Sequence, residues 1–113
     1  MPVVSVILLV WNNTEHLLKC LAVLQEQTHQ DFEIILLDNG SLDLTYLNRV
    51  SEKYAGMAIT VEKLASNRGF AAANNIGARL AHGHWIALLN ADAFPESDWL
   101  ENLLRAVQQN LQD

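Results

Sequence analysis

Two side chains with oxygen atoms that can bind a metal, Asn90 and Asp92, stand two residues apart in the stretch IALLNADAFPESDW (86–99). They follow an apolar run typical of a buried strand and precede a predicted helix. Carboxylate and amide oxygens bind hard cations, and Mg²⁺ needs only one or two protein ligands because it keeps waters and shares substrate phosphates. An Asx-type turn that leads into the helix near Pro95 explains the same spacing equally well.

A second candidate group follows another apolar run, in the stretch LLDNGSLD (36–43). Asp38 ends that run, and the Asn-Gly-Ser sequence after it forces a turn. Asp38 would accept hydrogen bonds from a ligand, while Gly40 would let the backbone approach that ligand closely. A loop capped by Asp43 at the start of the next helix is the alternative, and such loops are common.

A third stretch, SNRGFAAANNIG (66–77), places a glycine and three alanines before Asn74 and Asn75. A helix that starts here has free backbone N–H groups and a dipole that attract phosphate. Close packing of a small-residue helix on a sheet explains the alanines without any ligand. Two asparagines in a helix interior have unfavourable propensity, so we expect a compensating use for them.

These stretches lie in a regular alternation of strand and helix patterns. Strands are expected at 3–10, 32–38, 57–64 and 84–90, and helices at 14–27, 44–56, 69–83 and 96–110. This alternation predicts an α/β fold with a mainly parallel sheet of about four strands, helices on both faces, and 57–64 at a sheet edge. Ligands of open α/β sheets bind beyond the carboxyl ends of the strands, where polar residues follow all four runs.

The composition predicts one soluble domain over residues 1–113. The net charge of −6 and the scattered basic residues argue against nucleic-acid binding. The longest apolar stretch, VILLVW (6–11), is far short of the roughly 20 residues that a membrane span needs. The single Cys20 excludes internal disulfides and is expected to be a small buried hydrophobe, which favours a reducing, cytoplasmic location.

Signatures of other nucleotide-binding classes are absent from the sequence. It has neither the G-x-x-x-x-G-K-[ST] pattern nor a G-x-G-x-x-G pattern in the first loop, which argues against P-loop and dinucleotide sites. A phospho-acceptor signalling domain needs paired acids after the first strand, where Asn12 and Asn13 stand. Trp85 and Trp99 are expected in the core, whereas Trp11, at the first strand's tip, is placed to stack on a flat ring.

Four stretches taken together, VSVILLVWNNTEHLLKCLAVLQEQT, FEIILLDNGSLD, NRGFAAANNIG and WIALLNADAFPESDWL, resemble the sugar-nucleotide-binding domain of glycosyltransferase family 2, of GT-A type. The resemblance covers essentially the whole chain. It implies a three-layer α/β/α Rossmann-like fold and metal-dependent, inverting transfer of a sugar from a dTDP- or UDP-sugar to an acceptor hydroxyl. It looks most like the rhamnosyltransferase-like branch, and a non-catalytic nucleotide-sugar-binding module is the alternative.

The resemblance also implies site residues. Asp38 matches the acid that hydrogen-bonds the nucleobase, and Asp92, with Asn90, would bind the Mg²⁺ or Mn²⁺ that bridges the diphosphate. Two departures are visible: Asn90 replaces the first acid of the D-x-D motif, and Asn74 replaces a basic residue of many members. The nucleotide-binding residues implied are Val10, Trp11, Asn12, Asp38, Asn39, Gly40, Ser41, Asn67, Gly69, Asn74, Asn90 and Ala91.

The family's general base comes from a segment well downstream of the D-x-D motif. Glu96 and Asp98 are expected in the first turn of the last helix, where the helix dipole already explains acidic residues. We therefore expect the chain to be the donor-binding half, truncated before the acceptor-binding part and inactive alone.

The expected partners are a nucleoside-diphosphate sugar and a carbohydrate or lipid-linked glycan acceptor of cell-surface polysaccharide synthesis. An uncovered edge or face of the sheet favours self-association as a homodimer. For a full-length protein, the inner face of the membrane is the alternative location.

Overall fold

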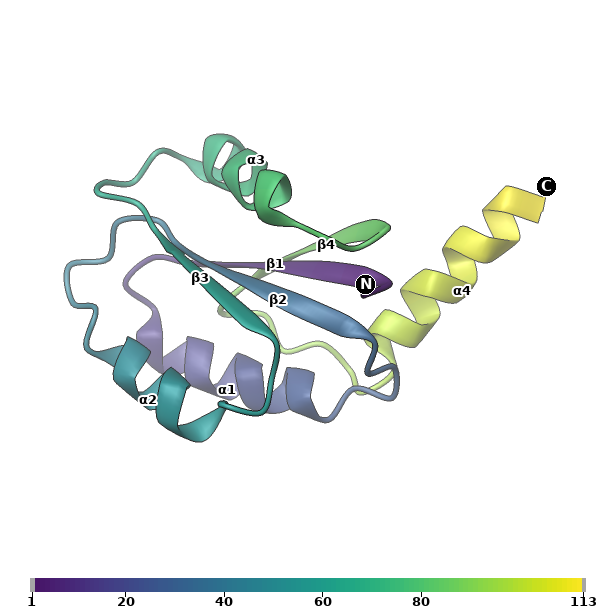
Figure 1. Cartoon of the computed structure of the whole chain (residues 1–113), viewed down its shortest axis with the longest axis horizontal. Coiled ribbons are helices and arrows are strands. Elements are labelled where there is room, and N and C mark those ends of the chain that lie inside the picture. Colours follow the sequence, from purple (N-terminus) through teal and green to yellow (C-terminus); the bar gives the residue numbers. More distant parts are fainter. Residues whose placement is uncertain (1, 113) are drawn as a thin grey trace.

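The computed structural model describes residues 2–112 as four strands that alternate with four helices (Figure 1). The elements are β1 (Val4–Val10), α1 (Thr14–Gln25), β2 (Phe32–Asp38), α2 (Tyr46–Lys53), β3 (Ile59–Lys63), α3 (Phe70–Leu80), β4 (Trp85–Asn90) and α4 (Trp99–Gln112). The strands form one sheet in the order β3-β2-β1-β4, and every pair is parallel. The predicted α/β fold is confirmed.

β1 is a central strand of this sheet. It pairs with β2 from Val4↔Phe32 to Val10↔Asp38, and with β4 from Val4↔Trp85 to Leu9↔Asn90. β1 and β2 are almost wholly buried, which agrees with their unbroken runs of Val, Ile and Leu. β3 is an edge strand, as predicted, and β4 forms the other edge.

Helices cover the two faces of the sheet unequally. α1 and α2 lie on one face, and α3 lies on the other (Figure 1). Alternate β1 residues such as Val6 and Leu8 pack in one core cluster with Leu17 and Leu21 of α1. On the opposite face α3 approaches β1 so closely that a Cβ on Gly77 would lie 2.6 Å from Cγ2 of Ile7. Glycine is therefore required where α3 crosses β1.

The start of the last helix differs from the prediction. α4 begins at Trp99 and not at residue 96, so Pro95 and Glu96 lie in the preceding loop. Placing Glu96 in the first helical turn was wrong. Asp98 directly precedes the helix, and its backbone carbonyl accepts a hydrogen bond from the N–H of Asn102 at 2.9 Å.

A buried amide holds this loop in place. Gln27, after α1, donates from Nε2 to the carbonyl of Glu96 at 2.7 Å, and its Oε1 accepts from the N–H of Leu100 at 3.1 Å. Gln27 is 3% exposed, so both bonds are shielded from water. The loop and the first turn of α4 are thereby bound to the end of α1, and the remaining turns of α4 project beyond the sheet (Figure 1).

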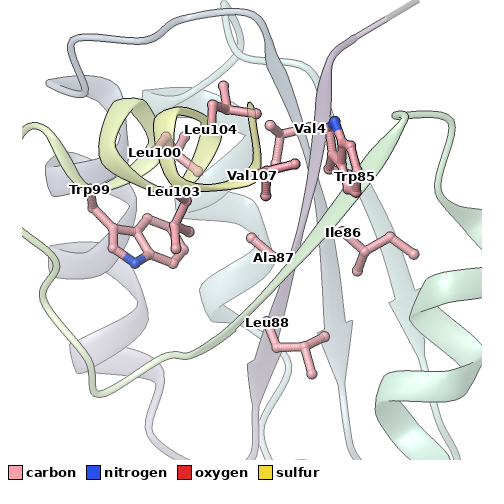
Figure 2. A pocket seen from close by; sticks show the side chains of 10 residues that line it. All are labelled: Val4, Trp85, Ile86, Ala87, Leu88, Trp99, Leu100, Leu103, Leu104 and Val107. Atoms are coloured by element: carbon pink, nitrogen blue, oxygen red, sulfur yellow. The ribbon is translucent and has the colours of Figure 1, made fainter. Parts of the chain in front are cut away.

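An apolar groove of about 370 Å³ lies between β4 and α4. Figure 2 shows Leu103, Leu104 and Val107 of α4 along one side, and Trp85 and Ile86 of β4 along the other.

The two tryptophans of this groove have different environments. Trp85 is 40% exposed, so its predicted place in the core was wrong: it lies on an edge strand and lines the open groove. Trp99 is partly buried against the core, as expected. Within residues 2–112, no helix is both long enough and apolar enough to cross a membrane.

Candidate functional site

The strand order places a crevice between the carboxyl ends of β1 and β4. From β1 the chain proceeds outward to β2 and β3, and then returns to the other side of β1 to form β4. Such a reversal of strand order is where open parallel sheets bind ligands. The N–H of Ala91 donates to the carbonyl of Leu9 at 2.9 Å, which fixes the two strand tips side by side.

A hollow of about 200 Å³ lies at this point. It brings together four of the predicted site residues, Trp11, Asn90, Ala91 and Asp92, although the first is about 80 positions from the others along the chain. The side chain of Trp11 is 52% exposed and forms part of the lining. Its full lining consists of Leu9, Trp11, Asn13, Asn90, Ala91 and Asp92. Asn13 is not among the predicted site residues, because side-chain type alone gives no signal for lining a hollow.

Two side chains with oxygen atoms in this hollow have no hydrogen-bond partner among the described residues. Asn90 and Asp92 are both exposed, and no hydrogen bond to either side chain is formed by any residue within 2–112. The same part of the chain holds no group of three or more His, Cys, Asp or Glu side chains that could enclose a metal. One carboxylate and one amide suit a hard cation that keeps waters and shares phosphates, not an all-protein cage.

The one thiol near this hollow is inert. Burial, and to a lesser extent the negative charge of Asp92, raise the pKa of Cys20 to about 12. Cys20 is fully buried in the core between α1 and the sheet, and it is therefore protonated at neutral pH. This agrees with its interpretation as a small hydrophobe, since only the thiolate is a nucleophile or a metal ligand.

Asp38 lies at the end of β2 but is not available to a ligand. It is 0% exposed. Its Oδ2 accepts a hydrogen bond from the hydroxyl of Tyr46 at 2.5 Å, and its Oδ1 accepts one from the N–H of Ser41 at 2.7 Å. Burial, and then the hydrogen bond to Asp38, raise the pKa of Tyr46 above its ordinary value. Because the side chain is buried and each oxygen already accepts a hydrogen bond from the protein, this geometry favours an indirect role of Asp38 over the predicted direct contact with a nucleobase.

The loops after β1 and β2 are joined by hydrogen bonds. Asn12 adopts a positive φ of 62°, its N–H donates to Oγ of Ser41 at 2.8 Å, and its Oδ1 accepts from the N–H of Leu42 at 3.0 Å. Val10, two residues earlier, has a buried side chain in the core, and its backbone carbonyl accepts a hydrogen bond from the N–H of Asn39. Val10 therefore contributes to this edge through its backbone, whereas the exposed Asn12 is bonded to the loop after β2 at the protein surface.

A second set of bonds joins the loop after β2 to the loop before α3. Asn39 accepts from the N–H of Arg68 at 3.0 Å, and donates to Oδ1 of Asn67 at 3.2 Å. Asn67 also accepts from the N–H of Gly69 at 2.7 Å. At Gly40, with φ +86°, a Cβ would lie 2.5 Å from a backbone carbon of the facing loop, so only glycine fits. Tyr46, which sequence reasoning missed, completes this framework.

Asn74 lies apart from these loops, on the buried side of α3. It is 7% exposed, and its Nδ2 donates to the carbonyl of Phe70 at 3.1 Å. Its Oδ1 has no hydrogen-bond partner among the described residues. The structure thus separates the predicted site residues into an open hollow beside β1 and β4, a bonded loop framework beside β2, and one half-satisfied amide on α3.

Many nucleotide-binding folds share a three-layer parallel sheet with a crevice at the strand reversal, and solved structures of the same architecture identify this one as a nucleotide-diphospho-sugar transferase fold of the GT-A type. The model of the family described as "Glycosyl transferase family 2" matches residues 5–113, and this chain belongs to that family. Glycosyltransferase AglE of Haloferax volcanii is 35% identical over 105 residues, which cover 89% of this chain and 34% of the relative. The amylovoran biosynthesis glycosyltransferase AmsB of Erwinia amylovora is 33% identical over 107 residues, which cover 93% of this chain and 36% of the relative.

Solved structures show the same architecture. The mannosyltransferase PcManGT from Pyrobaculum calidifontis, in complex with GDP-Man and Mn²⁺, superposes with a TM-score of 0.84 at 30% identity, covering 92% of this chain and 32% of that one. S. aureus TarS in complex with UDP-GlcNAc shares the fold, with a TM-score of 0.82 at 22% identity, covering 96% and 32%. The chain spans about a third of the length of the two relatives, of the PcManGT chain and of the TarS chain, which comprises residues 1–349 of TarS.

Proposed function

We propose that this chain is the donor-binding part of a metal-dependent, inverting glycosyltransferase. The donor is a nucleoside-diphosphate sugar, with a dTDP- or UDP-linked hexose or rhamnose as the expected class. The sugar is transferred to a hydroxyl of a carbohydrate or lipid-linked glycan. The resemblance to an enzyme of amylovoran biosynthesis supports a place in polysaccharide synthesis.

One observation carries this proposal. Trp11, Asn90 and Asp92 meet in a single hollow at the reversal of strand order, where parallel sheets bind nucleotides. An aromatic face and oxygen ligands without protein partners are the two features that a base and a metal-bound diphosphate require. The related PcManGT structure holds GDP-Man and Mn²⁺ on the same fold, which supports a divalent ion here.

The residues of the hollow have distinct roles in this proposal. The exposed ring of Trp11 stacks on the nucleobase, and Asp92 with Asn90 would hold Mg²⁺ or Mn²⁺. The ion, when bound, neutralises the negative charge that grows on the nucleoside diphosphate as it leaves. Asp38 acts indirectly, because its bonds to Tyr46 and Ser41 keep the loop after β2 in the conformation that borders the site.

The acceptor side of the reaction is assigned to other parts of a longer protein. Inverting transfer needs a carboxylate that takes the proton of the acceptor hydroxyl. Glu96 lies in a loop bonded to Gln27 through its backbone, and Asp98 directly precedes α4. Neither lines the hollow beside Asp92. Since the relatives are about three times as long, their remaining residues are the expected source of the base and of the acceptor-binding wall.

Nucleotide binding with and without metal tests the proposal. Isothermal titration with UDP and dTDP should show tighter binding in Mg²⁺ or Mn²⁺ than in chelator, and Asp92→Ala should abolish that difference. Asp31→Ala is the matched control, because Asp31 is also exposed but lies before β2, at the opposite end of the sheet. Equal affinity with metal and with chelator in the wild type would contradict the proposed metal site.

A further inference from the structure

The side chain of Asn74 has an unusual environment for an amide in a helix. It is 7% exposed, its Nδ2 is bonded to the carbonyl of Phe70, and its Oδ1 has no partner among residues 2–112. A buried carbonyl oxygen without a hydrogen bond lowers stability, because it has lost its water and gained nothing in exchange. The neighbouring Asn75 is exposed and has no such constraint. The orphan acceptor of Asn74 therefore requires an explanation.

Asn74 lies at the same edge of the sheet as the hollow, as the following register shows. α3 covers the face of the sheet to which Ile7 points, since Gly77 lies against Ile7. Because side chains alternate along a strand, Leu9 and its partner Asn90 point to this same face. α3 follows β3 and so begins at the carboxyl edge of the sheet, and Asn74 is its fifth residue. The amide thus lies at the same edge and on the same face as Asn90.

The chemistry of the orphan atom limits its partner. A carbonyl oxygen only accepts hydrogen bonds, so it needs a ligand group that donates one. The ionised oxygens of a diphosphate are acceptors and would be repelled, whereas a sugar hydroxyl donates readily. The proposed function assigns Trp11 to the base and Asp92 to the metal-bound diphosphate, which leaves the transferred sugar without a side chain.

We propose that Oδ1 of Asn74 accepts a hydrogen bond from a hydroxyl of the transferred sugar and so contributes to donor selection. This assignment rests on the proposed function. A basic side chain at position 74 would suit a phosphate, whereas the amide oxygen of Asn74 suits a hydroxyl.

An exposed side chain lies one helical turn before Asn74, at the start of α3. Phe70 precedes Asn74 by one helical turn, so the two side chains are neighbours on the surface of α3. Phe70 is 56% exposed and forms part of no packed core cluster. Exposed side chains change rotamer within picoseconds to nanoseconds, so Phe70 does not fix the approach to this part of α3.

Comparing nucleotides with nucleotide sugars tests the assignment. The Asn74→Ala and Asn75→Ala variants are titrated, in Mg²⁺, with UDP, UDP-glucose, dTDP and dTDP-glucose. Asn74→Ala should weaken the two nucleotide sugars by about threefold to tenfold, the range for one hydrogen bond, and should change UDP and dTDP by less than about twofold. Asn75→Ala should change neither class of ligand.

A stability measurement separates this role from a purely structural one. Asn74→Leu replaces an unsatisfied amide by an apolar group of similar size, so its urea midpoint should equal or exceed that of the wild type while nucleotide-sugar affinity falls. A lower midpoint, or equal weakening of nucleotides and nucleotide sugars, would overturn the assignment of Asn74. A wild type that binds no UDP or dTDP would overturn the proposed function as well.

Discussion

The carboxyl ends of β2 and β4 look alike in sequence and differ in the folded protein. Each strand is an apolar run that leads into a turn with an acid, Asp38 in one case and Asp92 in the other. Asp38 is fully buried, and both of its oxygens accept hydrogen bonds from the protein. Asp92 is exposed and lines an open hollow. One acid holds a loop together, and the other is available to a ligand.

The difference comes from what packs against each strand end. Tyr46 at the start of α2 places its hydroxyl over Asp38, and the loop after β2 folds back so that the N–H of Ser41 reaches the other oxygen. β4 is an edge strand, and the loop after it turns away toward Gln27. An acid at a strand end is thus structural or functional according to its tertiary neighbours.

The largest expected effect on stability follows from removing the buried carboxylate of Asp38. Asp38→Ala leaves the hydroxyl of Tyr46 and the N–H of Ser41 unpaired inside the protein, so the free energy of unfolding should fall by about 2–4 kcal/mol. Urea denaturation of the purified chain measures this. Tyr46→Phe, which removes only one of the two bonds, should cost less. An Asp38→Ala protein as stable as the wild type, yet unable to distinguish pyrimidine from purine nucleotides, would restore Asp38 to a direct role.

An intermediate effect is expected at the opposite end of β2, where Glu33 provides a second buried acid. Burial raises the pKa of Glu33, but hydrogen bonds from Ser5 at 2.6 Å and from the N–H of His82 at 2.6 Å, with the His82 ring, outweigh it and lower the pKa below its ordinary value of 4.5. Because the folded pKa is depressed, this stabilisation is complete above pH 4.5 and is lost as the pH falls through the folded value.

Glu33→Gln should therefore lower the free energy of unfolding at pH 7 by about 1–2 kcal/mol. Its stability should also fall less steeply than that of the wild type on acidification below pH 4.5, the ordinary pKa. Urea titrations at several pH values measure both effects, with the exposed Glu52→Gln as the control. Parallel pH profiles for Glu33→Gln and the wild type would contradict this prediction.

The smallest effect on stability should come from Asp92. Its side chain is exposed and has no protein partner within the described residues, so Asp92→Ala should change the free energy of unfolding by less than about 0.5 kcal/mol. Thermal unfolding of the metal-free protein measures it. A loss as large as that of Asp38→Ala would show that both acids are structural and would remove the contrast between the two strand ends.

The fold was predictable because its signals are local and repeated. Doubly buried strands appear as unbroken Val, Ile and Leu runs, and the helices between them have apolar residues at helical spacing, so neither depends on distant contacts. The hollow was predictable because parallel strands bring their carboxyl ends to one edge. Trp11 and Asp92 meet there because β1 and β4 are neighbours in the sheet. The polar residues at the strand ends do not by themselves predict this order of strands.

Other features were not predictable, because distant residues determine them. The burial of Asp38 depends on Tyr46, and the exposure of Trp85 depends on β4 being an edge. The late start of α4 depends on Gln27, which bonds the loop before it. Gln27 is 69 positions from Glu96, so no local pattern connects the two. Tyr46 is only eight positions from Asp38, but no sequence pattern predicts that a tyrosine hydroxyl will bond to an acid at that distance along the chain.

The central position of β1 has a consequence for synthesis on the ribosome. β1 is made first, and its pairing with β2 follows about 30 positions later, but its other partner, β4, is translated about 80 positions after it, which takes about 4–16 s at ordinary elongation rates. Throughout that interval one side of an apolar strand has unpaired N–H and carbonyl groups. The nascent chain therefore meets its greatest risk of misassociation before Asn90, Ala91 and Asp92 of the hollow have been synthesised, and pauses in translation before Trp85 would prolong it.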